Sequence, residues 1–328
     1  MNESLHDVSA PSAAAPAPEL ERSPCPNGCA PSDEILFEGK DRLHGVPGVF
    51  GVARCRSCGL MRTDPRPSPA SMGAFYPDDY HVYGAVPVRG GPPPHRGTLR
   101  RLGKKLVQFQ ADDLPVEPPG TLLEVGCASG HYLAALERLG WDVEGIEFSA
   151  SASAAATEAG FVVHNGPLES VEGPTRQFDV VVMRMVLEHL HDPVAGLRRL
   201  HAWTKPGGWL MVTVPDAGCF EMSLFKDAWY ALDLPRHLYH FTPETIGSVL
   251  ERGGWTLDRV MHQRDVANVV ASLGYAVSDR IQIPGVVDRL VRFPQTQSWE
   301  RFALYPLAAT LAAFGQTGRM TVWARRAD

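Results

Sequence analysis

The sequence lacks the features of membrane-spanning, secreted and nucleic-acid-coating proteins. Its 328 residues carry 31 Lys and Arg against 37 Asp and Glu, so the chain has no overall basic footprint for nucleic acid. The longest nearly apolar run, residues 302–314, contains Pro306 and is too short to cross a bilayer. Residues 1–24 mix acidic residues with Ala, Pro and Ser and hold no signal-peptide core. We expect a cytoplasmic protein that binds no nucleic acid.

Cysteine is scarce beyond the first 60 residues. Of six cysteines, Cys127 and Cys219 stand alone, whereas the other four form two close pairs: Cys25, Cys29, Cys55 and Cys58. Four thiolates in two pairs suit a tetrahedral structural zinc ion, which leaves no open position for catalysis. The spacing of the first pair, Cys25-x-x-x-Cys29, is one residue longer than the usual C-x-x-C. The alternative to a zinc site is therefore a degenerate module that binds no metal.

Composition divides the chain into four zones. Residues 1–24 are predicted to be a disordered tail, residues 25–85 a cysteine-bearing module, residues 86–96 a Gly- and Pro-rich linker, and residues 97–328 the main domain. A basic stretch runs from Arg96 to Lys105. We interpret it as a solvated helix near the ligand site, with contact to an anionic membrane surface or to a phosphate as the alternative.

Strand-like and helix-like segments alternate along the main domain. Apolar runs predict strands at 121–126, 142–148, 161–164, 178–183, 209–214, 255–263 and 318–325. Helical spacing predicts helices at 131–139, 149–159, 194–203 and 243–252, the third of them ended by a Lys-Pro-Gly-Gly turn. This alternation is typical of an α/β fold of the Rossmann-like, doubly wound kind, with a mostly parallel sheet covered on both faces.

The segment LLEVGCASG, residues 122–130, lies where the first predicted strand turns into the first helix. Gly126 allows a sharp turn, and Gly130 lets the helix begin close to the sheet. The spacing differs from the G-x-G-x-x-G of dinucleotide-binding loops, because Ala128 holds the second glycine position. Glu147 ends the second strand about 20 residues further on, where a carboxylate can accept both hydroxyls of a ribose.

These segments together resemble class I S-adenosylmethionine-dependent methyltransferases. LLEVGCASG resembles the first motif of that family, and GIEFS resembles its acidic second motif. FDVVVMRMVLEHLHDP and KPGGWLMVTVPD resemble the segments around the fourth and fifth strands. The resemblance implies a seven-stranded sheet whose last strand is antiparallel, with S-adenosyl-L-methionine as cofactor. Carried over by position, the residues expected at the cofactor are Glu124, Gly126, Ala128, Gly130, Glu147, Phe148, Gly166, Pro167, Leu168 and Met185.

A narrower likeness covers the N-terminal part. CRSCGLMRTDPRP followed by FYPDDYHVYG resembles the zinc-bearing front end of a methyltransferase subgroup found among sugar- and polysaccharide-modifying enzymes. The likeness implies that the four paired cysteines hold zinc.

Methyl transfer to a hydroxyl or a carbon acid requires an aligned acceptor and a group that removes a proton. The candidates are His189, on the loop after the fourth strand, and His237, Tyr239 and His240 in DLPRHLYHFT. This second segment follows the fifth strand, on the side where α/β ligand sites open. The alternative for His240 is a satisfied structural histidine, and a structural role is equally open for His189.

Three functions compete at this point. The leading one is a methyltransferase acting on a small molecule or a sugar or glycan. The second is a macromolecular methyltransferase whose cysteine module recognises RNA or protein; the acidic balance opposes RNA. The third is a non-catalytic cofactor-binding scaffold, which the intact loop and Glu147 oppose.

Overall fold

The computed structural model of the chain describes residues 18–76, 114, 116–281, 283–296 and 299–327. The predicted linker, the basic stretch from Arg96 to Lys105 and the first 17 residues of the predicted tail lie outside these ranges.

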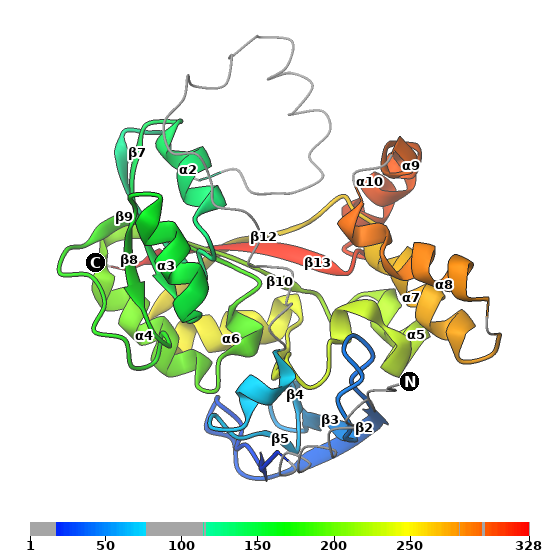
Figure 1. Cartoon of the computed structure of the whole chain (residues 1–328). Coiled ribbons are helices and arrows are strands. Elements are labelled where there is room, and N and C mark those ends of the chain that lie inside the picture. Colours follow the sequence, from blue (N-terminus) through cyan, green and yellow to red (C-terminus); the bar gives the residue numbers. More distant parts are fainter. Residues whose placement is uncertain (1–17, 77–113, 115, 282, 297–298, 328) are drawn as a thin grey trace, which may run out of the picture.

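A seven-stranded sheet forms the centre of the molecule (Figure 1). Its order from edge to edge is β12–β13–β10–β9–β6–β7–β8. The strands are β6 (Gly120–Val125), β7 (Trp141–Glu147), β8 (Val162–Asn165), β9 (Phe178–Arg184), β10 (Thr204–Pro215), β12 (Trp255–His262) and β13 (Arg319–Arg326). Only β13 pairs antiparallel, with β10 on one side and β12 on the other. The predicted Rossmann-like sheet with an antiparallel last strand is therefore confirmed.

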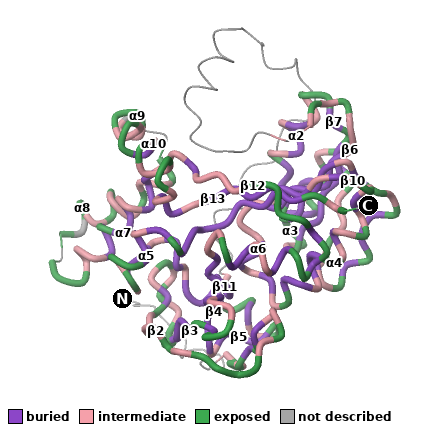
Figure 2. Tube along the Cα trace, turned by 180° about the vertical axis from the view of Figure 1, so that it is seen from behind, coloured by how far each residue is buried: buried purple, intermediate pink, exposed green. Residues whose placement is uncertain are grey.

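Successive strand residues pack against opposite faces of this sheet, as the pleat requires. Leu123 and Val181 belong to the core cluster that includes residues of α4 (Pro193–Trp203) and α6 (Pro243–Arg252). Leu122 and Val180 belong to the second cluster, together with residues of α2 (His131–Glu137). Figure 2 shows the central strands as largely buried. The sheet is thus covered on both faces, which is why its strands are apolar throughout.

Six further helices belong to the part of the chain that the structure describes. They are α3 (Ala150–Glu158), α5 (Phe220–Phe225), α7 (Ala267–Ser278), α8 (Pro284–Val291), α9 (Trp299–Ala303) and α10 (Tyr305–Ala313). Short 3₁₀ helices are η1 (Met72–Phe75), η3 (Leu187–His189), η4 (Lys226–Ala228), η5 (Tyr230–Leu232) and η6 (Phe293–Gln295). Among the described residues, no helix is long and apolar enough to span a membrane.

The N-terminal module, residues 18–76, is built into the main domain. Its strands are β1 (Leu20–Glu21), β2 (Asp33–Gly39), β3 (Phe50–Cys55), β4 (Met61–Thr63) and β5 (Arg66–Pro67). β11 (Tyr239–His240), from the main domain, pairs antiparallel with β4 and completes a four-stranded sheet (Figure 1). β1 pairs with β5, so residues 20–21 of the predicted tail are ordered against the module. The division of the chain at residues 24 and 85 stays a prediction.

One predicted turn differs from the structure. The Lys-Pro-Gly-Gly segment does not separate a helix from a strand, because β10 already begins at Thr204. The register with β9 shifts between Thr204 and Trp209, so the glycines form an irregularity inside the strand.

Candidate active site

A cavity of about 810 Å³ opens where β6, β7 and β9 end. We call it the central cavity. Its walls come from the loop after β6, the segments after β8 and β9, residues 230–237 and the N-terminal module. Ligand sites of doubly wound sheets lie at this carboxyl edge of the strands.

The loop after β6 has a backbone that only certain residues tolerate. Gly126 has φ 73°, and a Cβ atom there would lie 2.5 Å from Cγ2 of Val186. Ala128 also has a positive φ, 48°, which costs a non-glycine residue about 1–2 kcal/mol. Gly130 has φ 88° and caps α2, close to the ring of Phe161. Gly126 and Ala128 line the cavity, and strained backbone of the kind seen at Ala128 is common at binding sites.

Glu147 links this loop to the end of β7. Its carboxylate accepts hydrogen bonds from the backbone N–H groups of Ala128, at 2.8 Å, and Ser149, at 2.7 Å. Burial raises the pKa of Glu147, and these hydrogen bonds oppose that rise. A carboxylate has about four acceptor positions, so acceptor capacity remains for a ligand. The side chain lines the cavity and can accept hydroxyl groups there.

Most residues predicted at the cofactor lie at the central cavity. The lining includes Gly126, Ala128, Glu147, Phe148, Gly166, Pro167, Leu168 and Met185. Glu124 and Gly130 are not part of it. Glu124 is buried beneath the loop, 3.4 Å from the Arg184 guanidinium, and burial raises its pKa to about 7 against the effect of that cation. Arg184 itself reaches the cavity.

A cluster of Glu188, His189 and His237 lies at the base of the cavity. The two imidazole rings meet edge to face with centroids 4.6 Å apart, and both line the cavity. Nε2 of His237 is 3.9 Å from Oε1 of Glu188 and 3.8 Å from Oδ2 of Asp233. Burial lowers the pKa of His237 to about 3 and raises that of the Glu188 carboxyl to about 8. Of the four predicted proton-transfer candidates, the structure brings His189 and His237 together.

Tyr239 and His240 do not line the cavity, and this departs from the sequence prediction. Both belong to β11 and point into the interface with the N-terminal module. Nε2 of His240 is 3.2 Å from the Thr63 hydroxyl, and the Tyr239 hydroxyl donates to the carbonyl of His191. Burial lowers the pKa of His240 to about 4. His240 therefore fits the structural alternative given for it.

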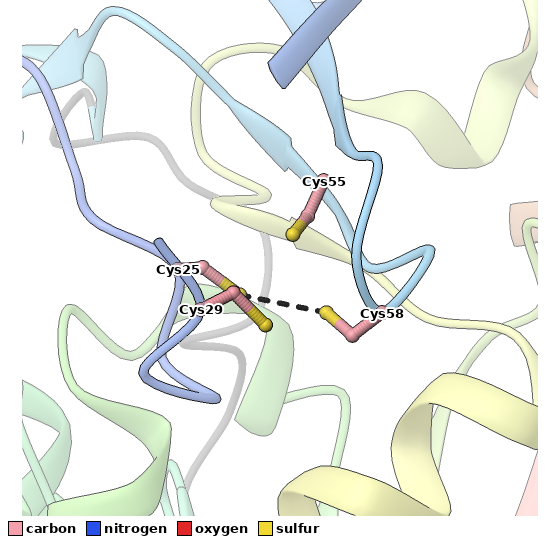
Figure 3. Close-up of side chains that lie close together, drawn as sticks. All are labelled: Cys25, Cys29, Cys55 and Cys58. Carbon is pink, nitrogen blue, oxygen red and sulfur yellow. Dashed lines mark hydrogen bonds between the residues drawn. The ribbon is translucent and has the colours of Figure 1, made fainter. Parts of the chain in front are cut away.

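The four paired cysteines converge in the N-terminal module (Figure 3). All four sulfurs lie within 4.8 Å of one another, and those of Cys25 and Cys58 are 3.5 Å apart. A tetrahedral zinc ion with bonds near 2.3 Å needs sulfur–sulfur distances of about 3.8 Å, so the group fits this metal. Burial raises the pKa of Cys58, but hydrogen bonds from Asn27 and the Leu60 backbone outweigh it and lower the pKa to about 7. A thiolate is thus favoured at Cys58, whereas burial raises the pKa values of Cys25 and Cys29.

The N-terminal module also shapes the cavity, which the sequence did not indicate. Tyr76 lines it and places its hydroxyl 2.9 Å from Nδ1 of His189. Arg236 forms a fully buried, two-bond ion pair with Asp41 of the module and a second pair with Asp233. The residues around His237 are therefore fixed from the module side.

Comparison with known proteins agrees with this geometry. Residues 95–260, about half of the chain, match a family described as "Methyltransferase domain". A ubiquinone biosynthesis O-methyltransferase of Cereibacter sphaeroides is 29% identical over 171 residues, covering 48% of this chain and 68% of that protein. The enzyme of the same name from Methylobacterium sp. is 33% identical over 157 residues, with coverage of 44% and 63%. The chain thus spans about two thirds of the length of these relatives.

Solved structures with a similar fold include phospholethanolamine N-methyltransferase 2 of Haemonchus contortus, with a TM-score of 0.47, 17% identity and coverage of 89% of this chain and 71% of that one. Geranyl diphosphate C-methyltransferase of Streptomyces coelicolor has a TM-score of 0.46 and 12% identity, and the match covers 79% of this chain and 98% of that one. The match to the family rests on the sequence over residues 95–260. The chain belongs to the methyltransferase-domain family and is a class I S-adenosylmethionine-dependent methyltransferase.

Proposed function

We propose that the central cavity binds S-adenosylmethionine and an acceptor that is a small molecule or a sugar or glycan unit. The observation that carries the proposal is Glu147, a buried carboxylate that lines the cavity and has acceptor capacity left for a ligand. It lies next to the loop after β6, whose backbone requires glycine at position 126. In this assignment Glu147 accepts the ribose hydroxyls. Phe148 and residues 166–168 contact the adenine, and the loop from Gly126 to Ala128 contacts the methionine end.

The acceptor side of the cavity is proposed to lie at His189 and His237. They line the same cavity as Glu147, and their unprotonated rings suit contact with an acceptor hydroxyl. The relatives named as ubiquinone biosynthesis O-methyltransferases support a small oxygen-bearing acceptor. The cavity volume of about 810 Å³ suits a cofactor with a small acceptor and leaves little room for a folded macromolecule.

We also propose a structural zinc ion at Cys25, Cys29, Cys55 and Cys58. The Asn27 amide donates to the Cys58 sulfur at 3.5 Å and also lies 2.9 Å from the Ser248 hydroxyl of α6. The metal would in this way be tied to the main domain. A closed set of four thiolates leaves no position for substrate, so the ion takes no part in methyl transfer.

The proposal is tested by transfer of labelled methyl groups from S-adenosylmethionine to nucleotide sugars, glycans and small phenols. We expect one of these classes to accept label, and His237→Ala to lower its turnover at least about tenfold while cofactor affinity is kept. His240→Ala is the matched control, because His240 lies away from the cavity. Full turnover in His237→Ala would move the acceptor site elsewhere.

A further inference from the structure

The carboxyl group of Glu188 is buried without a hydrogen-bond partner; Nε2 of His237 lies 3.9 Å away, and the Arg319 guanidinium acts on it only through its charge. Its side chain is 0% exposed, and neither oxygen has a hydrogen-bond partner among the residues that the structure describes. No Lys or Arg in those residues forms an ion pair with it. An isolated buried carboxylate costs several kcal/mol unless a cation or a donor meets it, and burial accordingly raises the pKa of Glu188 to about 8. A cation bound beside Glu188 would stabilise its ionised form and occupy acceptor positions that no described residue fills.

The two imidazoles beside Glu188 present lone pairs. Nδ1 of His237 lies 2.9 Å from the carbonyl of Ala231, and Nδ1 of His189 lies 3.0 Å from the carbonyl of Arg236. A carbonyl only accepts, so each Nδ1 carries the hydrogen; the Tyr76 hydroxyl oxygen, 2.9 Å from Nδ1 of His189, is then a second acceptor there, and each Nε2 keeps its lone pair. This is the arrangement of metal-binding histidines, whose second nitrogen donates to a backbone carbonyl.

We propose that Glu188, His189 and His237 bind a divalent first-row transition ion at the base of the central cavity. One oxygen and two nitrogen ligand atoms lie within 4.8 Å of one another. In a tetrahedral arrangement, bonds of 2.0–2.2 Å place donor atoms about 3.3–3.6 Å apart, so side-chain shifts that bring the donors closer by up to about 1.5 Å close the site. The proposal rests on the proposed function only for the role of the ion, which is to hold an oxygen atom of the acceptor.

The ligand set and the surroundings limit the kind of ion. Two imidazoles and one carboxylate suit Mn²⁺, Fe²⁺ or Zn²⁺, whereas Mg²⁺ prefers oxygen ligands. Three protein ligands leave positions open, and these face the cavity because His189 and His237 line it. Asp233 is the second carboxylate near Nε2 of His237, but Arg236 already pairs with it at 2.6 Å. The favoured ligand beyond the protein is therefore an acceptor with a hydroxyl or carboxylate oxygen.

Mn²⁺ is the probe that separates this site from the cysteines, because thiolates select zinc and bind Mn²⁺ poorly. Purified full-length protein is titrated with Mn²⁺, and the loss of the free-ion signal is followed by electron paramagnetic resonance. We expect about one bound Mn²⁺ per chain, and affinity at least about tenfold weaker in Glu188→Gln and in His189→Gln. Zinc is measured in the same samples and is expected to stay unchanged.

Glu221→Gln is the matched control. Glu221 is equally buried, but its oxygens accept from Nε1 of Trp229 and the N–H of Gly318. We expect this variant to bind Mn²⁺ like the wild type. Unchanged binding in both Glu188→Gln and His189→Gln would overturn the site, as would a wild type that binds no Mn²⁺ at millimolar concentration. Binding of S-adenosylhomocysteine, measured in parallel, distinguishes this failure from failure of the proposed function.

Discussion

The residues of the loop after β6 differ in how tightly their surroundings fix them. Ala128 has a positive φ, yet it has space for its methyl group and donates its N–H to Glu147. Gly126 has a positive φ and no space, since Val186 fills the position of a Cβ atom. The loop therefore accepts alanine at one of these positions and not at the other.

This difference predicts that one small substitution weakens cofactor binding and that the other leaves it nearly unchanged. Gly126→Ala forces Val186 and the loop apart, and we expect affinity for S-adenosylhomocysteine to fall more than about tenfold. Ala128→Gly removes the left-handed strain, and affinity is expected to stay within about threefold of wild type. Isothermal titration calorimetry measures both. Equal losses in the two variants would contradict this account of the loop.

Glu124 predicts a pH dependence of stability. Its pKa is raised by burial to about 7 in the folded protein, against about 4.3 in the unfolded chain. Between these values the folded state binds the extra proton, so the free energy of unfolding falls as the pH rises. Glu124→Gln removes this titration. We expect its stability relative to wild type to increase by about 2–3 kcal/mol from pH 5 to pH 8, measured by urea unfolding; a pH-independent difference would refute the assignment.

Single residues were predictable where a motif fixes their place. Gly126 and Glu147 follow from the strand–turn–helix pattern, and the structure brings both to one cavity. His240 was not predictable, because its position depends on the pairing of β11 with β4. The sequence offers no local signal for a contact between residues so far apart.

At the scale of elements, the pairing of β4 with β11 joins the N-terminal module to the segment that carries His237. The Thr63 hydroxyl donates to the carbonyl of His237 at 2.6 Å, and Asp41 holds Arg236 from the module side. Buried ion pairs of this kind are costly to break, because the remaining charge stays buried. The module thus positions the segment from Asp233 to His240.

Asp41→Ala tests this coupling. We expect the free energy of unfolding to drop by about 1.5–3 kcal/mol, because the Arg236 guanidinium loses the two bonds to Asp41 while its pair with Asp233 remains. Glu34→Ala serves as control: Glu34 pairs with Arg54 on the surface of the same module, and no measurable loss is expected. Thermal unfolding followed by circular dichroism measures both. Equal effects would show that the buried pair does not tie the module to the main domain.

The elements of the sheet were predictable because continuous apolar runs mark strands buried on both faces. The Lys-Pro-Gly-Gly residues bend the chain, with Gly207 at φ 69°, but they lie between Thr204 and Trp209, which both pair with β9, so the bend falls inside β10. The strands of the N-terminal module are short and irregular, and the sequence shows no periodic hydrophobic pattern that would predict them.

At the scale of the whole molecule, the central cavity combines parts from the entire chain. Its lining includes Met72 and Tyr76 from the module, the loops of the sheet, and Asn268, Tyr275 and Arg319 from the C-terminal part. The family match ends at residue 260, so residues on both sides of the matched region shape the cavity. These flanking parts are proposed to shape the acceptor side of the cavity, and their elements are the ones that the sequence predicts least well.

The helices α8 to α10 project from the body of the molecule (Figure 1), and their residues are mostly exposed or half-buried (Figure 2). Phe302 is 65% exposed and Phe314 is 76% exposed. The nearly apolar run from 302 to 314 is therefore only partly buried, with Ala308 as its buried member.

The central claim is that Glu147 holds the ribose of S-adenosylmethionine in the central cavity. Calorimetric titration with S-adenosylhomocysteine tests it most directly. Wild type should bind, and Glu147→Ala should bind more than about tenfold more weakly. Glu144→Ala is the control, because Glu144 lies on the same strand, outside the cavity lining, and pairs with His164 and Arg176. Its affinity should match wild type. Unchanged affinity in Glu147→Ala would contradict the account.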